Sequence, residues 1–186
     1  NGALLIMPIQ QMLLGAGGAA VATKTYVDDI FSTFLYTGNA TARSINTGVD
    51  MTEGGLVWIK NRDTAYNHFL TDTERGAGKE VLSSDSSAEL TSTSRLTSFG
   101  SSGFSLGNDD EYVNASNQDF ASWTFRKAPG FFDVVTYTGN AAWPERQISH
   151  NLGAIPGCIM IKNLSSSGDW HVYHVGADSI NPQYYA

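Results

Sequence analysis

The residues Tyr36-Thr37-Gly38-Asn39-Ala40 decide the organisation of this chain, because the same five residues return as Tyr137-Thr138-Gly139-Asn140-Ala141. A second motif follows each copy: Trp58-Ile59-Lys60-Asn61 returns as Met160-Ile161-Lys162-Asn163. The offsets between the copies are 101 and 102 residues, so one inserted residue separates the two motifs. A period of about 100 residues is too long for a solenoid unit and matches a small domain. The sequence therefore predicts one complete module and the first half of a second.

The segments around the repeated motifs have the pattern of short β-strands. Leu56-Val57-Trp58-Ile59 is an apolar run bounded by glycines and by a polar pair, and residues 120–125 alternate between two faces. Many short strands joined by glycine-rich turns favour a mainly β fold of tandem β-sandwich, jelly-roll-like modules. We place the first module at residues 34–127, a linker at 128–133 and a second, incomplete module at 134–186. Because half a sandwich leaves one sheet face uncovered, we expect the natural chain to continue past Ala186.

Residues 1–22 join a short apolar stretch to the run Gly15-Ala16-Gly17-Gly18-Ala19-Ala20. So short an apolar segment cannot bury its side chains alone, and exposed apolar surface invites association. We predict an attachment segment that docks on another protein, and the residues expected to make the contact are Ile6, Ile9, Met12, Leu13 and Leu14. The alternative is that this segment folds back onto its own module.

Residues 23–33 have the pattern of a short helix. Thr23 is a good N-cap, and Val27, Ile30 and Phe34 fall at i, i+3 and i+7 on one narrow apolar stripe. A helix of about 11 residues is marginal by itself in water. We predict that the stripe packs against copies of itself, as in a homotrimer. A helix lying on the following sandwich is the alternative.

Composition narrows the classes of partner. The net charge of −7 argues against a nucleic-acid surface, which needs clustered Lys and Arg. No stretch approaches the ~20 apolar residues that cross a bilayer, so we expect no membrane insertion. The single cysteine, Cys158, excludes an intrachain disulfide, and its apolar neighbours indicate a buried, unreactive thiol.

No motif predicts catalysis, and we expect no enzyme activity, no cofactor and no metal site. Residues 76–80 resemble a phosphate-binding loop but have neither its first glycine nor the Ser or Thr after the lysine. The acids Asp72, Glu74 and Glu80 are candidates for glycoside cleavage by composition alone. His171 and His174 lie three apart, which on a strand places them on opposite faces.

The acidic run at residues 109–111 leaves one metal-binding alternative open. Asp109, Asp110 and Glu111, with Asn108 and Asn114 nearby, could offer oxygen ligands to calcium, although their order fits no EF-hand pattern. A solvated acidic turn is the simpler interpretation.

Two features together resemble virion proteins of tailed bacteriophages. The segment Ala22-Thr23-Lys24-Thr25-Tyr26-Val27-Asp28-Asp29 is similar to the "ATKxYVD" segment near the base of phage tail-fibre proteins. The module with Trp58-Ile59-Lys60-Asn61, Leu96-Thr97-Ser98-Phe99 and Gly103-Phe104-Ser105-Leu106-Gly107 resembles a domain of tail-fibre and other structural proteins of marine phages, notably those that infect cyanobacteria.

This resemblance implies a non-enzymatic, trimeric fibre component of the virion. Its N-terminal part would attach to the tail, through adaptor or nozzle proteins, and its distal part would contact the host surface, including host glycans. Two alternatives stay open at this point. One is a carbohydrate-binding or glycan-degrading module acting at the host surface, and the other is a protein that decorates the capsid.

Overall fold

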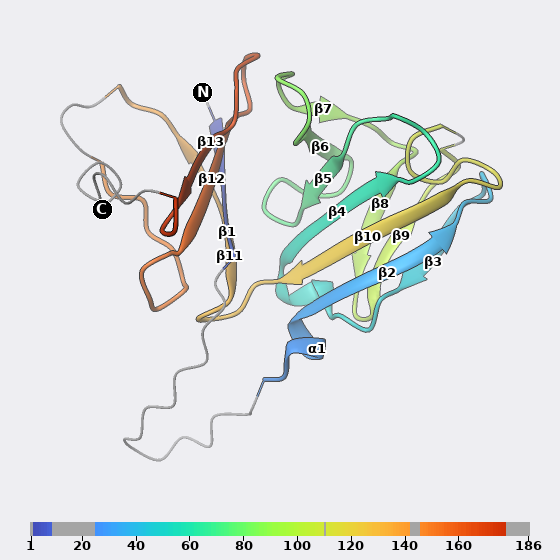
Figure 1. Ribbon diagram of the computed structural model, residues 1–186, viewed down its shortest axis with the longest axis horizontal. Helices are drawn as coiled ribbons and strands as arrows, with labels where there is room; N and C mark the ends of the chain where they lie inside the picture. Colours follow the sequence, from blue (N-terminus) through green and yellow to red (C-terminus); the bar gives the residue numbers. More distant parts are fainter. Residues whose placement is uncertain (1, 9–24, 110, 142–145, 178–186) are drawn as a thin grey trace.

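A computed structural model describes residues 2–8, 25–109, 111–141 and 146–177 (Figure 1). The described residues form three antiparallel sheets and one short α-helix, which confirms the predicted mainly β fold class. No helix among them is long and apolar enough to span a membrane. The elements are β1 Gly2–Pro8, α1 Val27–Ile30, β2 Phe31–Thr37, β3 Arg43–Asn46, the 3-10 helix Met51–Glu53, β4 Gly55–Asn61, β5 Phe69–Asp72, β6 Lys79–Leu82, β7 Leu90–Thr91, β8 Leu96–Gly100, β9 Gly103–Leu106, β10 Asp119–Arg126, β11 Phe132–Thr138, β12 Cys158–Asn163 and β13 His171–His174.

The first module is a two-layer sandwich. A six-stranded sheet with the order β2-β10-β4-β5-β6-β7, here the central sheet, packs on a three-stranded sheet with the order β3-β9-β8, here the outer sheet. Apolar side chains from the facing surfaces form one buried core that includes Tyr36, Val57, Ile59, Phe104 and Phe120. In β10 the predicted alternation holds, since Phe120 lies in this core while Phe125 packs on the opposite face. The predicted sandwich is therefore present.

A third sheet, with the order β11-β1-β12-β13, covers the other face of the central sheet at the left of Figure 1. Leu56, Leu70 and Val81 of the central sheet share a second core with Phe132 and Val134 of β11. All four residues of β5 are buried as a result, although a sheet with one open face would leave alternate residues exposed. The two copies are thus fused into three layers. The half-sandwich of the second copy, one face of which we expected to be uncovered, packs a face against the central sheet.

The predicted helix at residues 23–33 is much shorter in the structure. Of the described residues in that range, only Val27–Ile30 are helical, and the chain is extended from Phe31 onward. Backbone pairing explains the difference, because every residue from Phe31 to Thr37 faces a partner in β10. A ladder of interstrand hydrogen bonds stabilises these residues more than two further helical turns could.

The module boundaries also shift. The first sandwich begins at Phe31 rather than residue 34, and β11 already starts at Phe132 inside the predicted linker. The connection is consequently a tight turn, in which Ala128 bridges to Phe132 and Gly130 takes a left-handed φ of 71°. A turn this short helps to hold the two copies together.

Candidate functional site

The N-terminal apolar segment is an interior strand of the third sheet. β1 pairs with β11 on one side and β12 on the other, with Ile6 opposite Val134 and Met160. We predicted that residues 1–22 dock on another protein, yet the backbone of residues 2–8 is paired within this chain. The alternative of folding back is therefore the arrangement seen for Ile6. The remaining predicted contact residues, Ile9, Met12, Leu13 and Leu14, lie outside the described residues.

The three predicted self-association residues do not form one stripe. Val27 is 68% exposed, whereas Ile30 is 7% exposed and lies at the end of the helix. Phe34 belongs to β2 and packs against the core of the first sandwich. Two of the three side chains are thus used inside the chain, because the helix ends before Phe34. Val27, beside the exposed Tyr26, is the member available to a partner.

The second repeated motif has the same structural task in both copies. The Nζ of Lys60 donates to the carbonyl oxygens of Asn61 and Thr64, at 2.5 and 2.9 Å. Lys162 Nζ likewise donates to Gly168 O at 2.5 Å, and it also reaches Ser86 O at 2.9 Å in the first copy. The recurring lysine therefore stabilises the loop after its strand, and in the second copy it also ties the two copies together.

The asparagine of the same motif shapes the turn that follows. Asn61 Oδ1 accepts from the backbone N–H groups of residues 63 and 64, and Asn163 Oδ1 accepts from those of residues 165 and 166. Both are Asx-type turns. The repetition of Ile-Lys-Asn is explained by loop architecture, so it does not indicate a chemical site.

An arginine that follows each copy of the first repeated motif makes the same two contacts in both copies, and the comparison of the motifs did not predict it. Arg43 Nη1 donates to Thr37 O at 2.8 Å, and its guanidinium lies 5.5 Å from the Tyr36 ring centre. Arg146 repeats both contacts, since it donates to Thr138 O and lies 5.6 Å from the Tyr137 ring. Arg43 and Arg146 follow their tyrosines at different spacings, 7 and 9 residues. A search at one fixed offset therefore does not align them.

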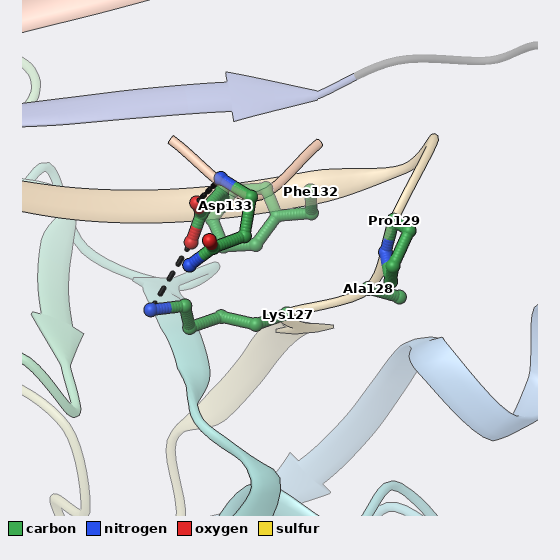
Figure 2. A pocket seen from close by; sticks show the side chains of 6 residues that line it. Lys127, Ala128, Pro129, Phe132 and Asp133 are labelled. Atoms are coloured by element: carbon green, nitrogen blue, oxygen red, sulfur yellow. Dashed lines mark hydrogen bonds and ion pairs between the residues drawn. The ribbon is translucent and has the colours of Figure 1, made fainter. Parts of the chain in front are cut away.

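The junction between the copies is held by an ion-pair triad of Glu74, Lys127 and Asp133, of which Figure 2 shows the Lys127–Asp133 pair. Lys127 Nζ lies 2.7 Å from Glu74 Oε1 and 3.1 Å from Asp133 Oδ1. Burial opposes the charged form of Lys127, but hydrogen bonds to both carboxylates raise its pKa. Asp133 also accepts from the backbone N–H groups of Val134 and Asn151.

A small cavity of about 160 Å³ lies beside this triad. Figure 2 shows the Lys127 side chain extending along the cavity toward the Asp133 carboxylate. The charged groups of its lining are therefore bonded to each other and to the backbone. This arrangement joins Glu74 of the first copy to the second copy, so its role is to fix their relative position.

The acids considered for glycoside cleavage are also engaged. Asp72 Oδ2 lies 2.5 Å from Arg75 Nε, and Glu80 Oε2 lies 2.6 Å from Arg95 Nη1. Burial raises the pKa of Glu80, and the Arg95 ion pair opposes that rise in part. With Glu74 bound to Lys127, all three acids have a cationic partner within the fold. These contacts support a structural role for each acid.

The acidic run at residues 109–111 is tied into its own loop as far as the structure describes it. Asp109 is 8% exposed, and its Oδ2 accepts from the backbone N–H groups of Tyr112 and Val113 at 2.7 and 2.8 Å. Asn114 donates to the carbonyl oxygens of Thr41 and Gly107. Asp110 lies outside the described residues. Within the described ranges, no three His, Cys, Asp or Glu side chains gather as a metal ion would require.

His171 and His174 lie in β13, the edge strand of the third sheet, and Cys158 lies in the neighbouring strand β12. Cys158 is opposite His174 and His171 is opposite Ile161. Burial raises the pKa of the Cys158 thiol, which disfavours the reactive thiolate. Cys158 is half-buried rather than fully buried as expected.

An aromatic patch lies on the part of the central sheet where β2, β10 and β4 are neighbours. Trp58 and Trp123 are opposite each other, and their rings meet edge to face at 6.0 Å. Trp58 Nε1 donates to His68 Nδ1 at 2.8 Å. Leu35, on the same face by its pairing with Ala121, is 58% exposed. We call Leu35, Trp58, His68 and Trp123 the tryptophan patch.

Comparison with known proteins gives a family but no activity. No curated protein matches the chain, and no solved structure matches it. Residues 27–184 match a family described as a domain of unknown function (DUF7483). The match begins at α1 and runs through both copies of the repeat, while β1 lies before it. Since this match covers most of the sequence, the chain belongs to the DUF7483 family of domains of unknown function.

Proposed function

We propose that this protein is a structural component of a tailed-phage virion and that it forms part of a tail fibre. The observation that carries the proposal is the fusion of two sequence repeats into three stacked sheets, with β5 buried on both faces. Doubly covered sheets resist local opening, because their backbone hydrogen bonds are shielded from water. That mechanical property suits a particle component that transmits load.

The resemblance of residues 22–29 and of the repeated module to phage structural proteins supports the same proposal. The internal ion pairs agree with it too. Lys127, Arg75 and Arg95 each fasten buried or half-buried acids of the framework. The resemblance and the ion pairs both support a structural role, and the family is described as a domain of unknown function.

The location is tested by immunogold labelling of purified particles of a tailed phage that encodes this chain. Antibodies against the recombinant protein are expected to label the tail. Label on the head would instead favour the capsid-decoration alternative. Particles that contain no trace of the chain by mass spectrometry would overturn the virion proposal.

Self-association is tested on the isolated protein. We propose a homotrimer, for which light scattering would give about three times the chain mass of 20.0 kDa. Val27→Asp places a charge on the exposed member of the predicted stripe and is expected to lower the measured mass. Thr97→Asp, on the exposed side of the outer sheet, is the control that leaves it unchanged. A wild-type monomer would refute the trimer.

A second candidate function, glycan binding, is favoured by the tryptophan patch. Partly exposed aromatic rings beside hydrogen-bonding groups provide a stacking surface for sugar rings. Loss of a sugar-stacking ring is expected to weaken binding at least about tenfold, equivalent to about 1.4 kcal/mol. A glycan screen followed by calorimetry on Trp123→Ala tests this, with Tyr66→Ala, an aromatic site elsewhere, as the control. Equal loss in both variants would count against the patch.

A further inference from the structure

β1 occupies in the third sheet the place that β10 occupies in the central sheet. β10 lies between β2 and β4, with Phe120 opposite both Tyr36 and Asn61. β1 lies between β11 and β12, with Ala3 opposite Tyr137 and Asn163. Tyr137 and Asn163 are the repeat counterparts of Tyr36 and Asn61. The two strands therefore agree in neighbours, direction and register on both sides.

The route by which each strand reaches its place differs. β10 follows the other strands of its own copy, whereas β1 precedes the whole family domain, which begins at residue 27. Eighteen residues stand between Pro8 and Val27, and their sequence includes three glycines and many alanines. A chain of that length can reach up to about 60 Å when extended, at about 3.3–3.6 Å per residue. The length suffices for β1 to enter either its own domain or a neighbouring one.

The position of β1 requires an apolar strand. β11 and β12 present Val134 and Met160 toward the central sheet, and Val135, Ile159 and Ile161 toward the cluster around Leu152 on the opposite face. A strand between two covered faces favours apolar residues at consecutive positions rather than at alternate ones. The sequence Ala-Leu-Leu-Ile-Met at residues 3–7 meets that requirement.

Removing β1 would leave two open edges. β11 and β12 would each expose a row of backbone N–H and C=O groups to the gap. Within the described residues, β1 pairs with these two strands and with no strand of the first sandwich. All of its ladder bonds can therefore be made by the same residues of another copy.

From these observations we propose that the gap between β11 and β12 is a strand-acceptor site, and that residues 2–8 of a second copy of this chain fill it in the assembled protein. Because the donated strand is identical in sequence, exchange preserves every backbone pairing and carries little energetic penalty. Main-chain pairing would supply affinity, and the apolar side chains would supply selectivity. The inference rests on geometry alone and stands whether or not the protein belongs to a virion.

A disulfide trap distinguishes exchange from pairing within one chain. Leu164 N–H donates to Gly2 O at 2.9 Å, which makes Ala3 and Asn163 a non-hydrogen-bonded pair. Cβ atoms of such pairs lie about 4.5–5.5 Å apart, close to disulfide range. The variant is Ala3→Cys with Asn163→Cys in full-length protein in which Cys158→Ser removes the native thiol. It is purified reduced, oxidised, denatured and run on a non-reducing gel.

Strand exchange predicts bands at twice the chain mass or higher, independent of dilution before oxidation. A single band of monomer mass with an internal crosslink would overturn exchange. The absence of any crosslink would overturn the placement of β1 itself. Ala3→Cys with Thr97→Cys, whose second cysteine lies on the exposed side of the outer sheet, reports random collisions and is expected to stay uncrosslinked.

A second measurement covers the case in which the double-cysteine protein fails to fold. Leu5→Pro removes a backbone N–H from the middle of β1 and should empty the acceptor site. A fluorescent peptide with the sequence of residues 1–14 is expected to bind this full-length variant with a rise in anisotropy. A scrambled peptide is expected to give no rise. Equal signals from both peptides would overturn a sequence-selective acceptor.

Discussion

Replacing the glycine of the first repeated motif by alanine, in each copy in turn, tests whether the same backbone contact packs on the motif in both copies. Gly38 and Gly139 hold the same place in the same five-residue motif. A Cβ atom on Gly38 would lie 2.1 Å from the backbone oxygen of Ala115, whereas a Cβ on Gly139 meets no described atom within 4 Å. The backbone of Gly38 is also bonded on both sides, to Gln118 O and from Asn117 N–H. Gly38→Ala must therefore push apart two backbone segments.

The magnitude follows from the atoms involved. Overpacking a well-packed site costs about 1–3 kcal/mol, and backbone atoms cannot rotate away, so we expect a loss near 3 kcal/mol for Gly38→Ala. For a chain of this length that is a fall in Tm of about 6–12 °C. Gly139→Ala has room for its methyl group and should change stability by less than about 1 kcal/mol, in the stabilising direction.

Thermal unfolding followed by far-UV circular dichroism and urea titration followed by tryptophan fluorescence measure both variants against wild type. The expected order of stability is Gly139→Ala, then wild type, then Gly38→Ala. Equal losses in the two variants would mean that the second copy is closed by a contact like that of Ala115. That result would refute the claim that the copies share a motif but differ in what packs on it.

Three further predictions concern the core that the two copies share, the titration of one histidine and the lysine that bridges the copies. Phe132→Ala removes a ring from the core that the two copies share, and it should lower the unfolding free energy by about 3–5 kcal/mol in one cooperative transition. The control is Ile155→Ala, at a side chain that is 91% exposed. An unchanged main transition in Phe132→Ala would show that the copies unfold separately. Burial, with the nearby charge of Lys60, lowers the pKa of His68, so the unfolded chain binds the proton first and stability should fall as pH drops below the ordinary value of 6.5. Urea titrations from pH 8 to pH 5 measure that fall, and His68→Gln should reduce it; an equal slope in the variant would exclude His68 as its source. Lys162→Met leaves two loop carbonyl oxygens without this donor and should lower the unfolding free energy by about 1–3 kcal/mol in the same titration, whereas an unchanged midpoint would contradict the bridging role.

The fold class could be predicted because the strand patterns are local. Leu56–Ile59 and residues 120–125 have strand periodicity that needs no knowledge of distant contacts. The repeat predicted that the second copy would form matching strands, and β11 and β12 do match β2 and β4. Local pattern and observed structure agree wherever a strand has its own clear period.

The prediction of a long helix is wrong where pairing with a distant strand determines the secondary structure. Residues 31–34 continue a helical spacing from Val27, and only their ladder with β10, 88 to 94 residues away, makes them a strand. No single-sequence pattern records that partner. For the same reason the pairing of Ile6 with β11 and β12 could not be predicted, because an apolar segment at a chain end carries no local indication of the gap between those strands.

A comparison of β1 with β10 shows what the repeat specifies. In both copies the repeated residues build two strands that flank one gap, β2 and β4 or β11 and β12, together with the loops that stabilise them. The strand in the gap is not repeated, since β10 alternates polar and apolar residues and β1 is apolar throughout residues 3–7. Burial alone does not account for the difference, because β10 also lies between two apolar clusters, with Phe120 in one and Phe125 in the other, and its polar residues Ser122 and Thr124 are fully buried. The repeat therefore encodes the two strands that flank the gap, and strands of different sequence fill that gap in the two copies.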